Sequence, residues 1–378
     1  MRYRRFGSFD WEVSVLAFGA ARLPFVGGDP ANLDEDGSAR MIRRAIDLGV
    51  NYLDLGHPYD LRRHERVCRV VGRSLRDGYR ERIRVAATLP TSLIKAAPDL
   101  DRCLSDQLGW LGMERIDYCL LGRLTRDNWP GLQEMGVLGW AEGAVRDGRI
   151  DKLGFSFHDH FQVLKAILGA YDHWALCRFQ YSYMDAAHDP GVSGIKYAAA
   201  MGLPVVVAEP LRSGRLTKEP PEEVAAIWAE AAHERSLAEW GLDFVWNHGE
   251  VSTVVCDMST MEQVEQNAAF ADRAAPDSLT VQEEVLISRV KDAYRTSRLV
   301  NCPSCRPCMP CPEGIDVPRI FEIYNDAAIY RDVHTARAIY HDEGHLPGRC
   351  VDCGSCESTC AKRLPIRDWL KKAGELLE

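Results

Sequence analysis

Two runs of closely spaced cysteines near the end of the chain have the residue type and spacing to bind iron. The first run is Cys302-Pro-Ser-Cys305-Arg-Pro-Cys308-Met-Pro-Cys311, and the second is Cys350-Val-Asp-Cys353-Gly-Ser-Cys356-Glu-Ser-Thr-Cys360. Thiolates at such short spacing can converge on one small inorganic core. Two runs of four therefore supply the eight ligands of two four-iron clusters.

The spacing also indicates how the ligands are shared. The second run has the C-x2-C-x2-C-x3-C spacing of bacterial ferredoxins, whereas the first run has a shorter last gap and ends with Pro312 after Cys311. In such pairs the fourth cysteine of one run ligates the cluster of the other run. By this rule the first cluster takes Cys302, Cys305, Cys308 and Cys360, and the second takes Cys350, Cys353, Cys356 and Cys311.

Two other uses of these cysteines are open at this point. Pairs of the form C-x2-C also bind structural zinc, but one zinc ion needs only two such pairs, and three close cysteines with a fourth suit a cluster better. Disulfides fit less well, because residues 1–7 show no export segment and cytosolic thiols stay reduced. We therefore expect an iron-sulfur protein of the cytoplasm.

The composition is typical of a chain that buries a core, and it argues against some classes of partner. With 378 residues, of which 46% are apolar, the chain has room for one large and one small domain. A net charge of -9 argues against nucleic acid or an anionic membrane as the main partner. No apolar run approaches the roughly 20 residues that a membrane helix needs.

The first 275 residues alternate short apolar runs with amphipathic stretches. The apolar runs are residues 13–18, 50–55, 83–87, 116–121, 152–156, 177–181, 203–208 and 252–256. Between them, stretches such as residues 37–48 and 98–111 place apolar residues at helical spacing. This alternation predicts an α/β domain, a (β/α)8 TIM barrel over residues 1–275. An open doubly wound sheet is the alternative, but no G-x-G-x-x-G follows the first strand.

The rest of the chain is predicted to be helical around the cysteines. Residues 276–299 combine many charged side chains with apolar residues at helical spacing, which predicts a helical connector. Residues 300–378 are predicted to form a small α-helical, ferredoxin-like 4Fe-4S domain. Within it, we expect one or two helices in residues 318–340 and a last helix at residues 365–377.

A candidate catalytic group lies where the second predicted strand ends, and in a barrel such strand ends carry the chemistry. The sequence there is Asp54-Leu-Gly-His57-Pro-Tyr59, and an aspartate followed five residues later by a tyrosine resembles the aldo-keto reductases. The resemblance implies that Tyr59 protonates a substrate carbonyl while NADPH delivers hydride. It also implies that Asp54 belongs to the network around the tyrosine.

Further motifs extend the resemblance along nearly the whole chain. They are Gly154-Phe-Ser156-Phe-His158, Gln180-Tyr-Ser-Tyr183, Glu209-Pro-Leu-Arg212-Ser-Gly214, Met258-Ser-Thr-Met-Glu-Gln263-Val-Glu-Gln266-Asn267 and Cys308-Met-Pro-Cys311-Pro312. Together they are similar to the branch of the family that carries a C-terminal ferredoxin-like dicluster domain. The resemblance implies an NADP(H) site formed by Ser156, Gln180, Arg212, Gly214, Ser259, Gln263 and Asn267.

Two catalytic positions that the resemblance implies are not kept. Thr88 (or Leu89, in a shifted register) stands where a lysine should end the third strand, and Gly122 stands where a histidine should follow the fourth. An ammonium group near a tyrosine lowers the pKa of the phenol from its usual value near 10. Without that lysine we expect Tyr59 to be a poorer general acid.

Other residues could change the chemistry at the same place. His158 and His57 are candidate proton donors, because a histidine titrates near neutral pH. Asp257 stands where the resemblance implies a glycine, and its carboxylate disfavours the 2'-phosphate of NADPH. The sequence thus leaves open whether a nicotinamide nucleotide binds.

Three functions agree with these residues. The first is an iron-sulfur oxidoreductase that acts on a small organic substrate at the barrel mouth and exchanges electrons with a ferredoxin- or flavoprotein-type partner through its clusters. The second is a non-catalytic barrel that serves as an electron-transfer subunit of a partner enzyme. The third is ordinary NADPH-dependent carbonyl reduction, with clusters that only stabilise the fold.

Overall fold

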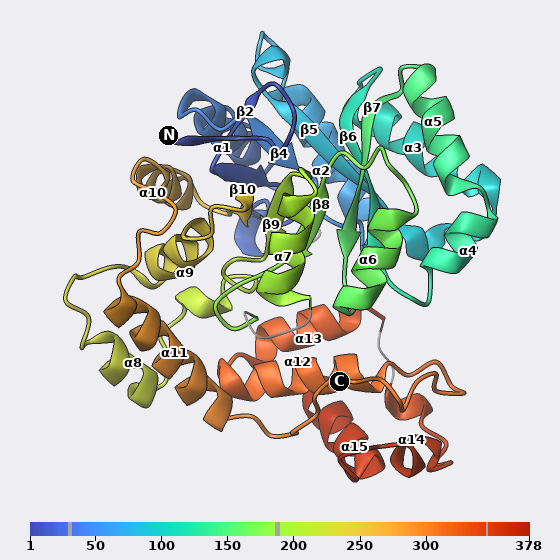
Figure 1. Cartoon of the computed structure of the whole chain (residues 1–378), viewed down its shortest axis with the longest axis vertical. Helices are drawn as coiled ribbons and strands as arrows, with labels where there is room; N and C mark the ends of the chain where they lie inside the picture. Colours follow the sequence, from blue (N-terminus) through green and yellow to red (C-terminus); the bar gives the residue numbers. More distant parts are fainter. Residues whose placement is uncertain (29–31, 186–189, 345–346) are drawn as a thin grey trace. The chain divides into compact units, whose positions relative to one another are not determined.

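The computed structural model describes residues 1–28, 32–185, 190–344 and 347–378, and the chain forms two compact units (Figure 1). The first unit contains Met1–Ser213 and Arg235–Thr280, and the second contains Gly214–Glu234 and Val281–Glu378. The second unit therefore includes a segment from the middle of the chain as well as its end.

Parallel strands form a closed barrel in the first unit (Figure 1). In chain order they are β3 (Leu16–Gly19), β4 (Tyr52–Asp54), β5 (Arg84–Leu89), β6 (Ile116–Leu124), β7 (Ile150–Phe157), β8 (Cys177–Gln180), β9 (Val205–Ala208) and β10 (Val251–Asp257). Each strand pairs with the next along the chain, and β10 pairs with β3 to close the barrel. Strands covered on both faces have continuous apolar sequences, and all eight predicted apolar runs form barrel strands. The expected (β/α)8 barrel is confirmed.

Helices cover the outside of the barrel (Figure 1). In this unit they are α1 (Glu35–Asp47), α2 (Leu61–Ser74), α3 (Ala97–Leu111), α4 (Trp129–Glu134), α5 (Val137–Arg146), α6 (Phe161–Gly169), α7 (Gly191–Ala200), α9 (Leu237–Trp246) and α10 (Met261–Ala271), with short 3-10 turns η1 (Val26–Gly28), η2 (Arg80–Arg82) and η3 (Thr91–Leu93). The carboxylate of Asp60 caps α2 by accepting hydrogen bonds from the amides of Arg62 and Arg63. This cap fixes the start of α2 directly after Tyr59.

An antiparallel hairpin of β1 (Tyr3–Arg5) and β2 (Glu12–Ser14) precedes the barrel. The ring of Phe6, beside this hairpin, packs against Trp11, Tyr52 and Tyr118, with centroid distances of 4.8, 5.9 and 5.4 Å. Because Tyr52 begins β4, this aromatic layer fills the amino end of the barrel. In (β/α)8 enzymes the active site lies at the opposite end of the barrel, at the carboxyl ends of the strands.

The second unit is helical. It contains η4 (Arg215–Thr217), α8 (Glu222–Trp228), α11 (Val281–Thr296), α12 (Val317–Ile329), α13 (Val333–Asp342), η5 (Pro347–Arg349), α14 (Ser355–Ser358) and α15 (Ile366–Leu377). Its small core centres on Ile320, Phe321, Tyr340 and Leu370, and six of the eight clustered cysteines pack against that core. The two predicted stretches of residues 318–340 and 365–377 form helices, the first of them as the pair α12 and α13.

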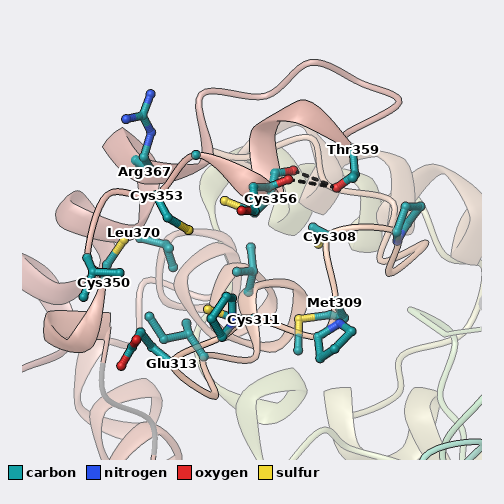
Figure 2. Close-up of a pocket in the computed structure, with 18 residues that line it drawn as sticks. Cys308, Met309, Cys311, Glu313, Cys350, Cys353, Cys356, Thr359, Arg367 and Leu370 are labelled. Carbon is teal, nitrogen blue, oxygen red and sulfur yellow. Dashed lines mark hydrogen bonds between the residues drawn. The ribbon is translucent and has the colours of Figure 1, made fainter.

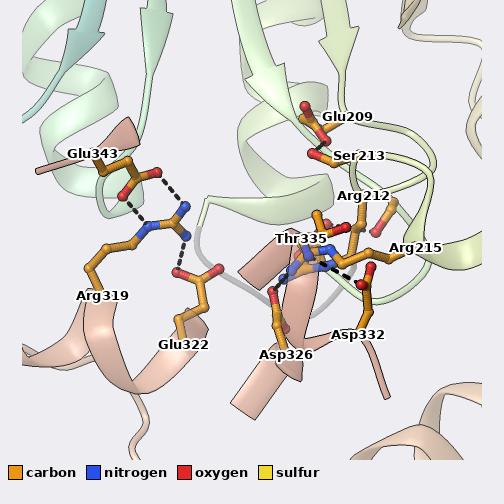
Figure 3. A network of polar contacts seen from close by, with 12 residues as sticks. Glu209, Arg212, Ser213, Arg215, Arg319, Glu322, Asp326, Asp332, Thr335 and Glu343 are labelled. Carbon is orange, nitrogen blue, oxygen red and sulfur yellow. Dashed lines mark hydrogen bonds and ion pairs between the residues drawn. The ribbon is translucent and has the colours of Figure 1, made fainter. Parts of the chain in front are cut away.

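Ion pairs hold the mid-chain segment within the second unit (Figure 3). The guanidinium of Arg215 lies 2.5 Å from Asp326 of α12, with both side chains buried, and the ammonium of Lys218 lies 2.5 Å from Asp332. Arg319 of α12 bonds Glu322 and Glu343. Removing one partner of a buried pair typically costs about 3–5 kcal/mol, so Arg215 is an anchor of this segment.

The division of the chain differs from the expected one in two places. The predicted connector, residues 276–299, contains α11, which belongs to the second unit together with residues 214–234. The sequence does not indicate that the segment after β9 belongs to the second unit, because Arg215 and its partner Asp326 are 111 residues apart. In the part of the chain that the structure describes, no helix is both long enough and apolar enough to cross a bilayer.

Candidate functional sites

Five cysteines line a cavity of about 180 Å³ in the second unit (Figure 2). They are Cys308 and Cys311 from the loop before α12, Cys350 and Cys353 from the loop before α14, and Cys356 from α14 itself. The cavity therefore brings the last cysteine of the first run together with the first three of the second run.

The other cysteines of the two runs are also close to one another. Burial raises the pKa of Cys302 above its usual value, and the thiols of Cys305 and Cys360 raise it further. Burial likewise raises the pKa of Cys308 to about 11, with contributions from Cys302, Cys356 and Cys305. Cys360, the last cysteine of the second run, thus lies near Cys302 of the first run, and Cys302 lies near both Cys305 and Cys308.

The backbone has the same unusual turn in both runs. Left-handed residues flank the second cysteine of each run: Ser304 (φ 55°) and Arg306 (φ 64°) around Cys305, and Asp352 (φ 55°) and Gly354 (φ 73°) around Cys353. This conformation costs roughly 1–2 kcal/mol for a residue other than glycine. Turns of this kind form concave rows of backbone N–H groups that bind anions, including iron-sulfur groups.

Hydrogen bonds from the protein reach several of the sulfurs. The amide of Leu364 donates to the sulfur of Cys360 at 3.5 Å. The hydroxyl and amide of Ser355 lower the pKa of Cys353, and the amide of Ser304 partly offsets the raised pKa of Cys302. Among the described residues, no three side chains of His, Cys, Asp or Glu are grouped closely enough for a single metal ion. A cluster core needs wider spacing, because iron and sulfide lie between its thiolates.

A buried ion pair lies beneath the carboxyl end of the barrel. Asp54, the last residue of β4, places its Oδ1 atom 2.5 Å from the Nη1 atom of Arg178 on β8, and it also accepts a hydrogen bond from the amide of Gly56. Burial acts to lower the pKa of Arg178, but the charge and hydrogen bond of Asp54 raise it overall. The guanidinium therefore stays charged inside the barrel and holds the start of the loop that carries Tyr59.

Tyr59 is accessible at the mouth and contacts a second arginine. Half of its surface is exposed, at 50%, and the Nη1 atom of Arg123 donates a hydrogen bond of 2.7 Å to its hydroxyl oxygen. Arg123 comes from β6, directly after Gly122. The sequence offers no signal for this contact, because the two residues come from different strand ends 64 residues apart.

His57 lies beside Tyr59, with ring centroids 4.6 Å apart. Burial lowers the pKa of His57 well below 6.5, and the charges of Arg123 and Arg178 and the nearby His158 lower it further. Its Nδ1 atom is buried and has no hydrogen-bond partner. His57 is therefore a neutral imidazole with one unused nitrogen, and not a group that is protonated at neutral pH.

Thr88 and Gly122, the residues predicted to stand at two catalytic positions, lie on the neighbouring strands β5 and β6. Thr88 is fully buried at the end of β5, and its hydroxyl has no partner. Gly122 lies against the ring of His57: a Cβ atom built at Gly122 would stand 2.9 Å from two ring atoms. His158 lies exposed just beyond β7, where its amide donates to the carbonyl of Leu124.

Most residues proposed to bind a nucleotide are engaged within the protein. Ser156 accepts a hydrogen bond from the amide of Arg123, and the Arg212 guanidinium is paired with Asp185. The Gln263 side chain accepts a hydrogen bond from the amide of Ser259, and the Asn267 amide group bonds the sulfur of Cys256. Gln180 ends β8, and Gly214 (φ 82°) begins the segment that belongs to the second unit.

Two carboxylates stand near the ends of β9 and β10. Burial raises the pKa of Asp257 to about 6, and Glu209 raises it further, with a partial offset from Arg22. The Oδ1 atom of Asp257 accepts a hydrogen bond from the amide of Ala21 and would lie 2.3 Å from a Cβ atom at Gly19. The negative charge predicted from Asp257 is thus held inside the barrel mouth.

Comparisons with known proteins agree with this architecture. The model of the aldo/keto reductase family matches residues 15–279. L-galactose dehydrogenase of Arabidopsis thaliana is 25% identical over 310 residues, which cover 75% of this chain and 91% of that protein. Subunit alpha 1 of the acetyl-CoA decarbonylase/synthase complex of Methanosarcina barkeri is 30% identical over 86 residues, 22% of this chain and 9% of the subunit.

Solved structures share the barrel. An aldo-keto reductase from Bacillus halodurans in its holo form superposes with a TM-score of 0.63 at 24% identity, covering 77% of this chain and 96% of that one. An aldo-keto reductase from Klebsiella pneumoniae in complex with NADPH gives a TM-score of 0.60 at 22% identity, covering 77% and 95%. With a family match over most of its length and an eight-stranded barrel that carries Asp54 and Tyr59 at its mouth, this chain belongs to the aldo/keto reductase family and is an oxidoreductase.

Proposed function

We propose that this protein is an iron-sulfur oxidoreductase, in which a small organic substrate reacts at the barrel mouth and electrons pass through two 4Fe-4S clusters. The observation that carries the proposal is the exchange of the fourth cysteines. Cys311 shares a cavity wall with Cys350, Cys353 and Cys356, while Cys360 lies beside Cys302. Two neighbouring clusters of the ferredoxin type require this exchange.

The donor atoms suit such clusters. The two ligand sets would be Cys302, Cys305, Cys308 and Cys360, and Cys350, Cys353, Cys356 and Cys311. Hydrogen bonds to the sulfurs and left-handed turns at the second cysteine of each run support this assignment. When bound, each cluster would transfer one electron at a time. Cys305 and Cys353 are exposed, which suits electron exchange with a ferredoxin or flavoprotein. Because thiolates must stay reduced, the cytoplasm is the favoured compartment.

The residues at the barrel mouth supply proton chemistry. The Tyr59 hydroxyl is exposed and can give its proton to an oxygen of the substrate. His158 is also exposed and is the second candidate proton donor in this region. It lies close enough to His57 to lower the pKa of that residue. Asp54 holds the start of the loop that leads to Tyr59, because it accepts hydrogen bonds from the amide of Gly56 and from Arg178. The name of the relative L-galactose dehydrogenase favours a substrate with a reacting hydroxyl or carbonyl group.

The described residues fit NADP(H) poorly. The carboxylates of Asp257 and Glu209 would repel a pyrophosphate or a 2'-phosphate, and the Arg212 guanidinium is already paired with Asp185. No part of the proposed chemistry therefore depends on this nucleotide.

NADPH-dependent carbonyl reduction is the second candidate function. It is favoured by the Klebsiella pneumoniae structure, which has the same fold and is a complex with NADPH. A non-catalytic barrel in an electron-transfer subunit is a third reading, and the preformed contacts around Tyr59 speak against it.

The deciding experiment adds electron donors and substrates to anaerobically purified protein while the clusters are followed by absorbance and electron paramagnetic resonance. We expect about eight iron atoms per chain, cluster reduction by dithionite, and reoxidation of the reduced clusters by a short aldehyde or an aldose. Aldehyde reduction by NADPH with no change in the clusters would favour the second candidate. Clusters that react with a partner protein but with no small substrate would favour the electron-transfer subunit.

A further inference from the structure

We infer that Arg123 is a catalytic residue, whose guanidinium provides beside the Tyr59 hydroxyl the fixed positive charge that Thr88 cannot supply. This inference rests on the proposed role of Tyr59 as the proton donor. Arg123 lies on β6, directly after Gly122, whereas Tyr59 follows β4.

The contact between Arg123 and Tyr59 has a direction. A guanidinium has only donors, so the hydrogen bond of 2.7 Å runs from Nη1 of Arg123 to the phenol oxygen of Tyr59. The hydrogen of the phenol must then point away from Arg123. The guanidinium carbon also lies 5.7 Å from the centre of the tyrosine ring, within the range of a cation-π contact. Arg123 thus places a positive charge beside the Tyr59 hydroxyl and orients that hydroxyl.

The backbone of Arg123 is held in place for this contact. Its φ of 51° is uncommon for a residue with a side chain. The amide of Arg123 donates to Ser156 at 2.7 Å, and its carbonyl accepts a bond of 2.9 Å from the Asn128 side chain. The hydroxyl of Thr91 donates to the carbonyl of Gly122 at 2.6 Å. Strain held by several contacts is characteristic of functional positions.

His57 completes the group. Its ring occupies the space that a side chain at position 122 would need, since a Cβ there would come within 2.9 Å of Nδ1. That nitrogen is buried without a partner, beside Tyr59. Because the imidazole is neutral, Arg123 is the cation that bonds Tyr59.

The proton transfer from Tyr59 to the substrate needs no further side chain as a proton source. The O–H bond of Tyr59 breaks as a new O–H bond forms on the substrate oxygen, where negative charge develops during reduction. The phenolate left on Tyr59 keeps its hydrogen bond from Arg123, and the exposed hydroxyl regains a proton from water. This hydrogen bond from a charged donor to the oxygen is short and strong, and it offsets the negative charge that the transfer leaves there.

The first test measures the reactivity of Tyr59 itself. N-acetylimidazole acetylates tyrosine through the phenolate, and peptide mass spectrometry of the intact, cluster-loaded chain reports each tyrosine separately. With exposed Tyr3 as the internal reference, Arg123→Met is expected to slow acetylation of Tyr59 about tenfold, whereas Arg123→Lys restores most of it. Arg126→Met is the matched control, because Arg126 lies three residues away and bonds Asp159. Unchanged or faster labelling of Tyr59 in Arg123→Met overturns the inference.

The second test separates this inference from the proposed function. With a short aldehyde or aldose as probe, Arg123→Met should lower kcat about a hundredfold and change KM less than about threefold, with partial rescue by lysine. If the unmodified protein turns over no probe but the labelling of Tyr59 depends on Arg123, the inference stands and the proposed function fails. If the protein is active and Arg123→Met keeps its kcat, the inference fails and the function stands.

Discussion

The barrel mouth and the cysteine cavity assemble their polar groups in different ways. At the mouth, Asp54, Arg123 and Arg178 come from three different strands, and each is already bonded to another side chain. In the cavity, the cysteines come from two short loops and the short helix α14, and the groups that bond Cys353 include the backbone amide of Ser355. The mouth is a preformed site supported by a large packed core, whereas the second unit has a small core. Small cores usually need a metal or a similar cross-link to be stable.

Removing a cysteine should therefore have the largest effect of all. Cys311→Ala and Cys360→Ala are each expected to lose about half of the iron, because each removes the fourth ligand of a different cluster. The signals that disappear in electron paramagnetic resonance should differ between the two variants, and the second unit should lose protection in hydrogen exchange. Cys177→Ala, a buried barrel cysteine, is the control and should keep all the iron. Full iron content in both ligand variants would refute the ligand assignment.

Removing one partner of the buried ion pair should affect the barrel next most strongly. Asp54→Leu leaves the guanidinium of Arg178 buried without its carboxylate, which is expected to cost about 3–5 kcal/mol of the free energy of unfolding. The measurement is hydrogen exchange of the amides in β4 and β8 during urea unfolding. The double variant Asp54→Leu with Arg178→Met should recover much of the loss, because it removes both charges. A single variant as stable as the unmodified barrel would show that the pair is not desolvated.

The carboxylate of Asp257 should destabilise the fold at neutral pH, whereas that of Asp54 stabilises it. Its pKa is about 6 in the folded chain, above the usual 3.8, so the folded state binds the extra proton between these values. The resulting stability is present below pH 3.8 and is lost as the pH rises through about 6. Asp257→Asn should thus raise the free energy of unfolding by up to about 3 kcal/mol at pH 8 and by little at pH 4. Urea unfolding at the two pH values measures the difference.

Asp106→Asn on the exposed face of α3 is the control for charge removal and should give no such pH dependence. An Asp257→Asn gain that is equal at both pH values would show that packing, and not ionisation, is responsible. Tighter binding of NADPH by the same variant would further show that this carboxylate opposes the nucleotide.

The contrast between the regions also explains what the sequence could reveal. Barrel strands were predictable because continuous apolar runs are a local property, and the cysteine runs because ligand spacing is local too. Arg178 was not, because it lies inside an apolar run and its partner Asp54 is 124 residues away. Arg123 follows Gly122 without any motif, so only the folded barrel shows its contact with Tyr59. The exposed His158 and the neutral state of His57 likewise depend on burial, which spacing does not give.

The smallest effect is expected from filling the space beside His57, a change that tests whether the barrel mouth is preformed. In Gly122→Ala the new Cβ would lie 2.6 Å from the carbonyl oxygen of Leu89 and 2.9 Å from two atoms of the His57 ring. Overpacking of this kind costs about 1–3 kcal/mol, and the ring is the part that can move. We therefore expect a modest loss of stability in urea unfolding and a clear loss of turnover.

Two further variants separate packing from chemistry. Gly122→Ala combined with His57→Ala should regain part of the stability but not the turnover, because the ring is removed while the contact with the Leu89 carbonyl oxygen remains and the imidazole is lost. Gly139→Ala on α5, where a Cβ meets nothing within 4 Å, is the matched control and should be neutral or slightly stabilising. If Gly122→Ala left both stability and turnover unchanged, the mouth would be adaptable like a loop and not preformed, and the contrast with the cysteine cavity would lose its physical basis.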